Sequence, residues 1–177
     1  PPRSPPTRPP APTVDLLDLG AKGSMLTRLR AAGAGVWVLP AHTTADQILS
    51  LRPDAVLLSN GPGDPGRLGY AVETIRELVA MQTLPIMGIC LGHQLLTLAA
   101  GGRTTKMRFG HRGVNQPVLD LDTRRVAITT QNHGYVLDGA AIPPGFRVTH
   151  THLNAAPLEG TAPLTPPHRG APGPPGP

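Results

Sequence analysis

Short apolar runs alternate with amphipathic stretches between residues 14 and 102, and this alternation limits the possible folds more than any other feature of the 177-residue sequence. The runs have the length of β-strands, and the stretches between them repeat apolar residues at helical spacing. Expected strands are residues 14–19, 35–40, 54–59 and 84–89; expected helices are residues 24–33, 44–51, 68–81 and 93–102. The pattern predicts an α/β fold, a mostly parallel open sheet flanked by helices on both faces.

Two helices carry more detailed signals. Thr44 stands where an N-cap residue is expected. The stretch 68–81 places five apolar side chains on one helical face: Leu68, Val72, Ile75, Leu78 and Val79. After residue 104 the pattern becomes rich in strands, including residues 125–131 and 146–150. We expect this second part to be β-structure appended to the sheet.

Proline marks the expected domain boundaries. Residues 1–13 and residues 161–177 each contain seven of the 23 prolines. Such segments bury too little apolar surface to fold, so we expect disordered Pro-rich termini. One globular domain is expected between them, over residues 14–160.

Composition excludes several classes of protein. The single cysteine cannot form an internal disulfide, and no apolar run approaches the roughly 20 residues that span a bilayer. The N-terminus lacks the apolar segment of a secretory signal, so a cytoplasmic protein without membrane contact is expected. The net charge of +5 suggests nucleic acid, but the densest basic stretch, residues 103–112, contains one aromatic residue. Nucleic-acid binding is therefore not expected.

Two glycine-rich turns follow expected strands. Ligands of open α/β sheets bind outside the carboxyl ends of the strands, which makes both turns candidate sites. The first is LSNGPGDP, residues 58–65; its Gly61 and Gly63 could direct N–H groups to a ligand, although an ordinary turn has the same composition. The second, GICLG, centres on the lone Cys90.

Residues 88–92 have the spacing of a nucleophile elbow, with cysteine in place of serine. Glycines on both sides permit a sharp strand-to-helix turn that holds the nucleophile in a strained conformation. The thiol of Cys90 would lie at a helix N-terminus, which favours thiolate, and the Leu91 N–H could donate to an oxyanion. The alternative is a buried cysteine that fills space, a common fate of free cysteine.

Four motifs carry a family resemblance. LSNGPGDP, GICLGHQLL, FGHRGVNQPV and TTQNHGYVLD together resemble the class I glutamine amidotransferase domain of carbamoyl-phosphate synthase small subunits. The first two motifs are shared by triad-type amidotransferases, and the last two discriminate this branch. DLGAKGSMLTRL is similar to the opening strand and helix of that domain, so the resemblance spans residues 14–160.

The resemblance implies hydrolysis of glutamine through a cysteine thioester, with Cys90 as the nucleophile. It implies an oxyanion held by the N–H groups of Leu91 and Gly63. It also implies transfer of the ammonia to a large synthetase subunit, and the product would feed arginine or pyrimidine biosynthesis. ATP would bind that partner, and no cofactor or metal is expected in this chain. The residues implied to hold glutamine are Gly61, Gly63, Leu91, Gln94, Asn132, Gly134 and Tyr135.

The residue pattern supports part of this assignment. Gln94 follows Cys90 by four residues and would share its helix face. Asn132 lies in QNHG, which reads as a turn after a β-rich run. Both residues also have ordinary interpretations: Gln94 as a solvated helix residue and Asn132 as a turn former.

The general base is the point at which this sequence departs from the family. The family uses a histidine in a His-Pro-Glu motif, which this sequence lacks. His168 stands near the expected place, and His133 is the alternative; His93 is not expected to serve. His150 and His152 alternate on one face of a strand, which we interpret as a solvated edge rather than a metal site.

We hypothesise that the tail, residues 161–177, reflects a frameshift or truncation, which translation of the other reading frames would test. Two alternatives to an active glutaminase follow. One is a catalytically impaired fragment that binds glutamine or a partner without turnover. The other, a different cysteine hydrolase on the same fold, would make the two discriminating motifs coincidental.

Overall fold

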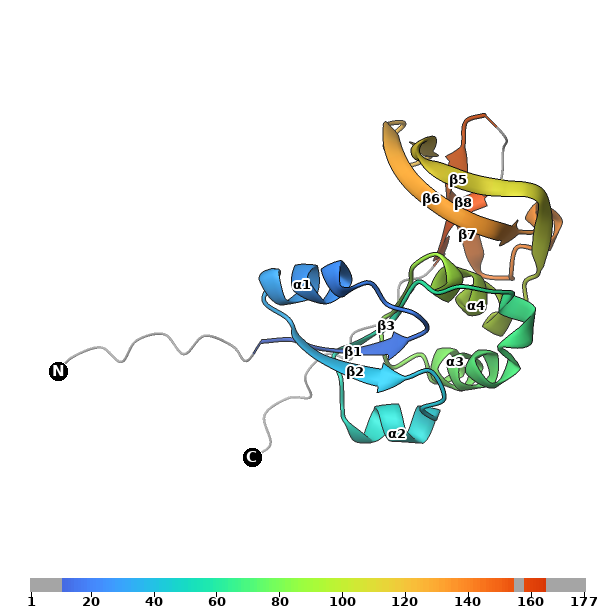
Figure 1. The fold of residues 1–177 in the computed structure, drawn as a ribbon. Helices are drawn as coiled ribbons and strands as arrows, with labels where there is room; N and C mark the ends of the chain where they lie inside the picture. Colours follow the sequence, from blue (N-terminus) through green and yellow to red (C-terminus); the bar gives the residue numbers. More distant parts are fainter. Residues whose placement is uncertain (1–10, 155–157, 165–177) are drawn as a thin grey trace.

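A computed structural model describes residues 11–154 and 158–164 as two layered parts, a parallel sheet with helices and a β-barrel (Figure 1). We expected disorder in residues 1–13 and 161–177, and most of these residues lie outside those that the structure describes. Thr13 begins the first strand, and Thr161–Pro163 pair within the last, so the ordered body extends beyond the predicted limits of 14 and 160.

The sheet confirms the predicted parallel arrangement. Its strands are β1 (Thr13–Asp18), β2 (Gly35–Pro40), β3 (Ala55–Leu58) and β4 (Ile86–Gly88), in the order β2-β1-β3-β4. All three pairings are parallel, with Leu17 opposite Leu58 and Leu58 opposite Gly88. This register brings the ends of β1, β3 and β4 to one edge, from which both glycine-rich turns leave.

Helices cover both faces of this sheet. They are α1 (Gly23–Ala31), α2 (Ala45–Ser50), α3 (Gly69–Met81) and α4 (Leu91–Ala99), and a 3-10 turn, η1 (Pro65–Arg67), precedes α3. Figure 1 shows α1 on the opposite side of the sheet from α2, with α4 between the sheet and the barrel. Thr44 caps α2 as predicted: its side chain accepts from the Gln47 N–H, and the Gln47 side chain accepts from the Thr44 N–H.

The core lies between the sheet and three of the helices. α2, α3 and α4 bury one continuous apolar cluster against β1 and β3. The predicted face of α3 points into it: Val72, Ile75 and Leu78 are buried, and Leu68 and Val79 pack at its margin. The cluster consists of Leu17, Ala45, Ile48, Val56, Leu58, Ala71, Val72, Ile75, Leu78, Leu91, Leu95 and Ala99.

The second half of the chain does not extend the sheet, contrary to our expectation. β5 (Thr104–Asp120), β6 (Val126–Leu137), β7 (Phe146–His152) and β8 (Leu158–Pro163) close into a barrel in the order β5-β6-β8-β7; η2 (Gly139–Ala141) joins β6 to β7. β5 and β6 form an antiparallel pair whose free edges are taken by β7 and β8. Closure leaves neither strand an edge to offer the parallel sheet.

No helix among the described residues is long and apolar enough to cross a membrane.

Candidate active site

The strand-to-helix turn at Cys90 has the geometry of a nucleophile elbow. Cys90 adopts φ 53° and ψ −108°, a strained conformation for a residue other than glycine, at the N-cap of α4. A side chain on Gly88 would place its Cβ 2.4 Å from the backbone of Gly92, and one on Gly92 would lie 2.3 Å from the Leu58 carbonyl oxygen. Only glycine therefore fits on either side of the cysteine.

Burial opposes the expected ionisation of the thiol. Cys90 is half-buried, and this burial raises the pKa of its thiol; the negative charge of Glu159 raises the pKa further. A hydrogen bond from the Leu91 N–H and the positive charge of Lys22 lower the pKa, but less than burial raises it. The Leu91 N–H at the helix N-terminus thus favours thiolate as predicted, but burial outweighs it, so a base is needed to remove the proton before the sulfur can attack.

A cavity of about 460 Å³ opens between the elbow and the barrel. Its lining includes Cys90 together with every residue expected from the resemblance to hold glutamine: Gly61, Gly63, Leu91, Gln94, Asn132, Gly134 and Tyr135. These residues come from the turn after β3, from α4 and from β6. The fold thus brings them together around one thiol, while their individual roles stay predictions.

The turn after β3 is held close to the end of β1. A Cβ on Gly61 would lie 2.0 Å from the Leu19 carbonyl oxygen, and the Asn60 side chain donates to the Gly20 carbonyl oxygen at 3.0 Å. Gly63 has φ +102°, with open space where a side chain would be. Its backbone can therefore approach a ligand without a side chain between them.

The opposite wall of the cavity is formed by β6. QNHG is not a turn: Gln131 and Asn132 pair with Gly113 and Arg112 inside the antiparallel ladder. Asn132 itself is exposed. Asn132 lies on strand β6, and the β-rich sequence before it indicated this position.

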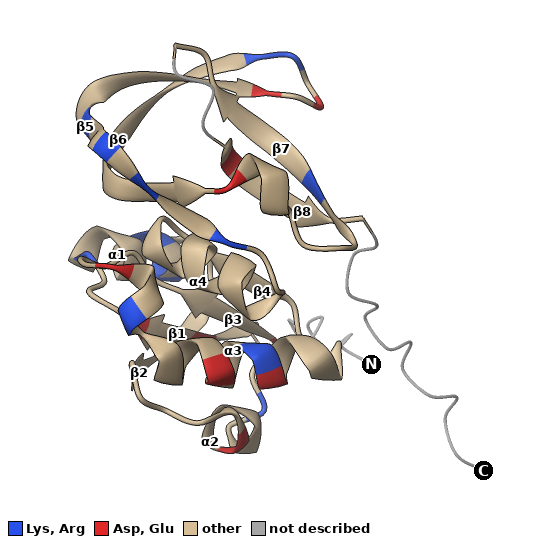
Figure 2. Cartoon of the chain, turned by 90° about the vertical axis from the view of Figure 1, so that its right-hand side faces the viewer, with Lys and Arg blue, Asp and Glu red and all other residues tan. Residues whose placement is uncertain are grey.

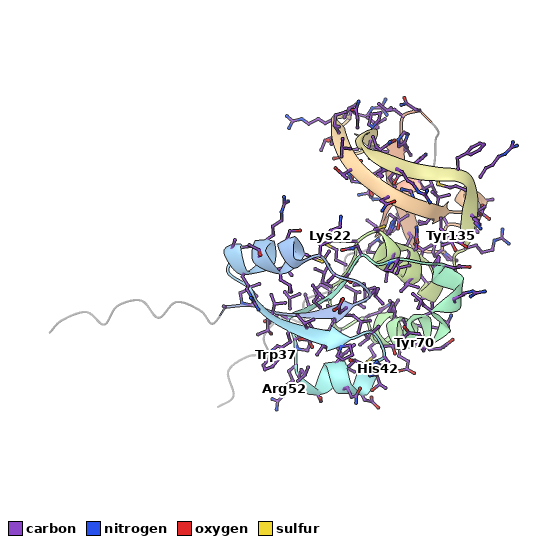
Figure 3. All side chains as sticks on the ribbon, viewed as in Figure 1. Lys22, Trp37, His42, Arg52, Tyr70 and Tyr135 are labelled. Atoms are coloured by element: carbon purple, nitrogen blue, oxygen red, sulfur yellow. The ribbon has the colours of Figure 1, made fainter. Side chains whose placement is uncertain are left out.

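Gln94 joins the two walls and is not a solvated helix residue. Its side chain is 7% exposed, and its Nε2 donates to the Tyr135 carbonyl oxygen at 2.7 Å. The Tyr135 hydroxyl hydrogen-bonds to Asp64, and this contact raises the pKa of the phenol. Figure 3 shows Tyr135 where the barrel meets the helical layer.

Several histidines surround the thiol on the barrel side. A second cavity, of about 370 Å³, is lined by Cys90, His93, His133, His150 and Glu159 among others. Burial, with the charge of His150, lowers the pKa of His93 to about 4, and its Nε2 lies 2.9 Å from the Thr161 hydroxyl oxygen. His93 is therefore a weak base, as expected. His133 lies 3.8 Å from a Glu159 carboxylate oxygen, and His168 lies outside the described residues.

The interpretation of β7 as a solvated edge strand is wrong. β7 pairs with β5 on one side and with β8 on the other. His152 is 4% exposed; its Nδ1 accepts from the Asn154 N–H at 3.1 Å, and its Nε2 donates to Gln116 Oε1 at 2.8 Å. This histidine lies inside the barrel with both ring nitrogens occupied.

The sequence reasoning overlooked several charged residues at the site. Glu159, Lys22, Asp64, Lys106 and Arg112 either line the cavities or act on the thiol. Figure 2 shows basic segments along β5, on the barrel above the helical layer. Lys106 and Arg112 belong to the basic stretch 103–112, whose charge was weighed only for nucleic acid. Arg112 also lies in the motif FGHRGVNQPV, but neither residue was named as a site residue.

The profile described as "Glutamine amidotransferase class-I" matches residues 15–167. The chain belongs to the class I glutamine amidotransferase family. Two similar proteins are both called carbamoyl phosphate synthase small chain. The protein from Polynucleobacter necessarius subsp. necessarius (strain STIR1) is 50% identical over 145 residues, covering 82% of this chain and 36% of the relative. That from Pasteurella multocida (strain Pm70) is 54% identical over 136 residues, 77% of this chain and 35% of the relative.

Similar solved structures share the amidotransferase fold at low identity. A putative GMP synthase subunit from Thermoplasma acidophilum gives a TM-score of 0.75 at 17% identity, covering 89% of this chain and 80% of the other. A glutamine amidotransferase from Thermotoga maritima gives a TM-score of 0.66 at 16% identity, covering 88% of this chain and 72% of the other. This amidotransferase chain spans about a third of the length of the two small chains it matches.

Proposed function

We propose that this chain is the glutamine-hydrolysing module of a carbamoyl-phosphate synthase small subunit, acting in the cytoplasm. The observation that carries the proposal is the cavity shared by Cys90, the turn after β3 and β6. About half of the residues are identical to those of proteins called carbamoyl phosphate synthase small chain over most of this chain, which supports the choice among amidotransferase branches.

The reaction begins at the thiol. Once deprotonated, Cys90 Sγ attacks the side-chain amide carbon of glutamine, and the oxyanion accepts from the N–H groups of Leu91 and Gly63. Collapse breaks the carbon–nitrogen bond and releases ammonia after the nitrogen takes a proton, leaving a glutamyl thioester. Water then hydrolyses the thioester to glutamate and regenerates the thiol. The ammonia passes to a large synthetase subunit, which would bind ATP; this chain needs no cofactor for the hydrolysis.

The base has two candidates, His133 and His168. His133 lines the same cavity as Cys90 and lies beside Glu159, an arrangement that suits a base with a carboxylate partner. Replacement of His133 by Asn should lower kcat by roughly 10²–10⁴-fold if this histidine transfers the proton. An equal loss in His168→Ala, with His133→Asn unaffected, would assign the proton to His168.

Ammonia release from glutamine tests the proposal directly. The expected result is release by the chain that is abolished in Cys90→Ser, with a glutamine-analogue electrophile adding one mass increment at Cys90 only. His42→Ala, an exposed position beside α2, serves as the control and should leave the rate unchanged. Release that persists in Cys90→Ser would contradict the mechanism.

The absence of a His-Pro-Glu motif from the sequence favours one other function, binding of glutamine without turnover. In that case calorimetry detects glutamine binding while no ammonia appears. Addition of a carbamoyl-phosphate synthase large subunit separates a latent enzyme from a binding fragment, because only a latent enzyme then releases ammonia.

A further inference from the structure

Two histidines and a glutamate from three different strands converge inside the barrel. His111 lies on β5, His133 on β6 and Glu159 on β8. His111 Nδ1 is 3.5 Å from Glu159 Oε1, and His133 Nε2 is 3.8 Å from Glu159 Oε2. One ligand atom from each residue lies within 4.8 Å of the other two. The three side chains are 12–13% exposed, so the cluster is largely shielded from water.

These separations fit the coordination sphere of a small divalent ion. Zinc binds imidazole nitrogen and carboxylate oxygen at about 2.0–2.2 Å, which places tetrahedral ligand atoms about 3.4 Å apart. The two nitrogen–oxygen distances in the cluster lie close to that spacing. Two histidines with one glutamate are also a ligand set that zinc uses with a fourth position open.

The tautomer of His133 favours a ligand role. Its Nδ1 lies 2.9 Å from the Tyr135 carbonyl oxygen, which only accepts, so Nδ1 carries the hydrogen. In the neutral ring the lone pair is then on Nε2, which faces Gln131 Oε1 at 3.2 Å and Glu159 Oε2. A lone pair directed at oxygen acceptors calls for a proton or a cation between them. An Nδ1–H bonded to a backbone carbonyl is the usual support of a metal-binding imidazole.

Glu159 supplies the negative charge that such an ion would need. Its Oε1 is buried and has no hydrogen-bond partner. Among the described residues, its ion-pair partners within 4.0 Å are His111 and His133, with no lysine or arginine. A buried carboxylate without a full cationic partner is costly. The two nitrogens that would bind the ion, His111 Nδ1 and His133 Nε2, also face Gln131 Oε1, at 3.0 Å and 3.2 Å, and the ion would replace this amide contact.

We propose that His111, His133 and Glu159 bind one divalent transition-metal ion of the zinc class. His133 and Glu159 also line the cavity that Cys90 lines, so the proposed site adjoins that cavity. The bound ion would link β5, β6 and β8. Binding can be measured on a chain that releases no ammonia, so it does not depend on the glutaminase proposal. An ion on His133 Nε2 would occupy the lone pair that a base needs, so metal binding would leave His168 as the candidate base.

Cobalt(II) spectroscopy with zinc calorimetry tests the site. We expect one equivalent of Co²⁺ to give the visible bands of a four-coordinate ion, Zn²⁺ to displace it, and Zn²⁺ to raise Tm. His111→Ala and the nearly isosteric Glu159→Gln should each weaken zinc binding by at least roughly 10-fold. His42→Ala is the matched control, because Figure 3 places His42 near α2, away from the barrel. The zinc affinity of this variant should equal that of the wild type.

Far-UV circular dichroism of the metal-free variants checks that each one folds. A folded Glu159→Gln chain with unchanged zinc affinity would overturn the proposal, as would the absence of any one-equivalent binding. Two further variants exclude other ligands: loss of zinc binding in His168→Ala, or loss of a thiolate–cobalt band in Cys90→Ser, would also refute the three-residue assignment.

Discussion

Asp15 and Cys90 are two single residues at which burial opposes the charged form of a side chain. For Cys90 the consequence is chemical, because a protonated thiol needs a base. For Asp15 it is energetic. Asp15 and Leu17 are two residues apart on β1, so their side chains point to the same face of the sheet. Leu17 belongs to the core, and Asp15 therefore faces the core as well. It is 1% exposed, and neither carboxylate oxygen has a hydrogen-bond partner.

Replacement of Asp15 by Val should stabilise the protein. Burial raises the pKa of Asp15, so the unfolded chain loses its proton near pH 3.8 while the folded chain keeps it. Stability from this site is present below that pH and is lost as pH rises through the folded pKa. Asp15→Val should raise the free energy of unfolding at pH 7 by roughly 2–4 kcal/mol.

Urea unfolding of the wild type and Asp15→Val at pH 4 and pH 7 measures this effect. The difference between the two proteins should be larger at pH 7. Asp46→Val, at an exposed position in the first turn of α2, is the control and should not reproduce the gain. Equal stabilisation at both pH values would show that the Asp15 carboxyl does not titrate as described.

At the scale of elements, α4 is fixed to the barrel by polar contacts as well as by its apolar face. Leu91, Leu95 and Ala99 face the core. On another side of α4, His93 lies 2.9 Å from the Thr161 hydroxyl oxygen of β8. The packing of β8 against α4 should therefore depend on pH. A protonated His93 carries a charge that burial disfavours, so protonation favours its exposure to water and weakens this packing.

The acid sensitivity of this docking can be predicted. The pKa of His93 is about 4 in the folded chain and near 6.5 unfolded, so the unfolded chain binds more protons between these values. Stability therefore falls as pH drops from 6.5 towards 4, by roughly 3 kcal/mol. His93→Gln should remove most of that loss while retaining a hydrogen-bonding side chain.

The measurement is the free energy of unfolding at pH 7, 5.5 and 4.5. Substitution of the exposed His42 by Gln provides the comparison and should leave the acid slope as in the wild type. An unchanged slope in His93→Gln would mean that another group, such as the buried His152, causes the acid loss. The pKa of His152 is also lowered, chiefly by burial.

At the scale of the whole molecule, the candidate site exists only because the barrel is held over the carboxyl edge of the sheet. Gln94 donates from α4 to the Tyr135 carbonyl oxygen on β6, and the Tyr135 hydroxyl bonds to Asp64 in the turn after β3. Both bonds join Tyr135, which belongs to the barrel, to residues of the α/β part. They link the walls of the cavity around Cys90.

Loss of the Gln94 bond should loosen this boundary. Gln94→Met keeps the helix propensity and approximate shape but removes the donor, and should cost about 1 kcal/mol of stability. Hydrogen exchange should become faster in residues 132–136 and stay unchanged in β1. Thr97→Val, which removes a hydroxyl that donates within α4 to the His93 carbonyl oxygen, is the control. Equal protection of residues 132–136 in both variants would contradict a linking role.

Much of the α/β half could be predicted because its signals are local. Apolar spacing fixed the strands and helices, Thr44 and Gln47 fixed the start of α2, and glycines at 88 and 92 fixed the elbow around Cys90. Each of these depends on sterics or hydrogen bonds within a few residues. The residues implied by the motifs also line one cavity with Cys90, and they could be named in advance because three separate segments carried recognisable patterns.

The tertiary structure decided what depends on neighbours distant in sequence. Closure of the barrel, the strand position of Asn132 and the burial of His152 follow from pairings that the apolar pattern does not encode. The raised pKa of the Cys90 thiol comes from desolvation and from Glu159, 69 residues away along the chain. Burial and charge act through space, so the sequence by itself determined which groups were present, and the fold determined their protonation and their partners.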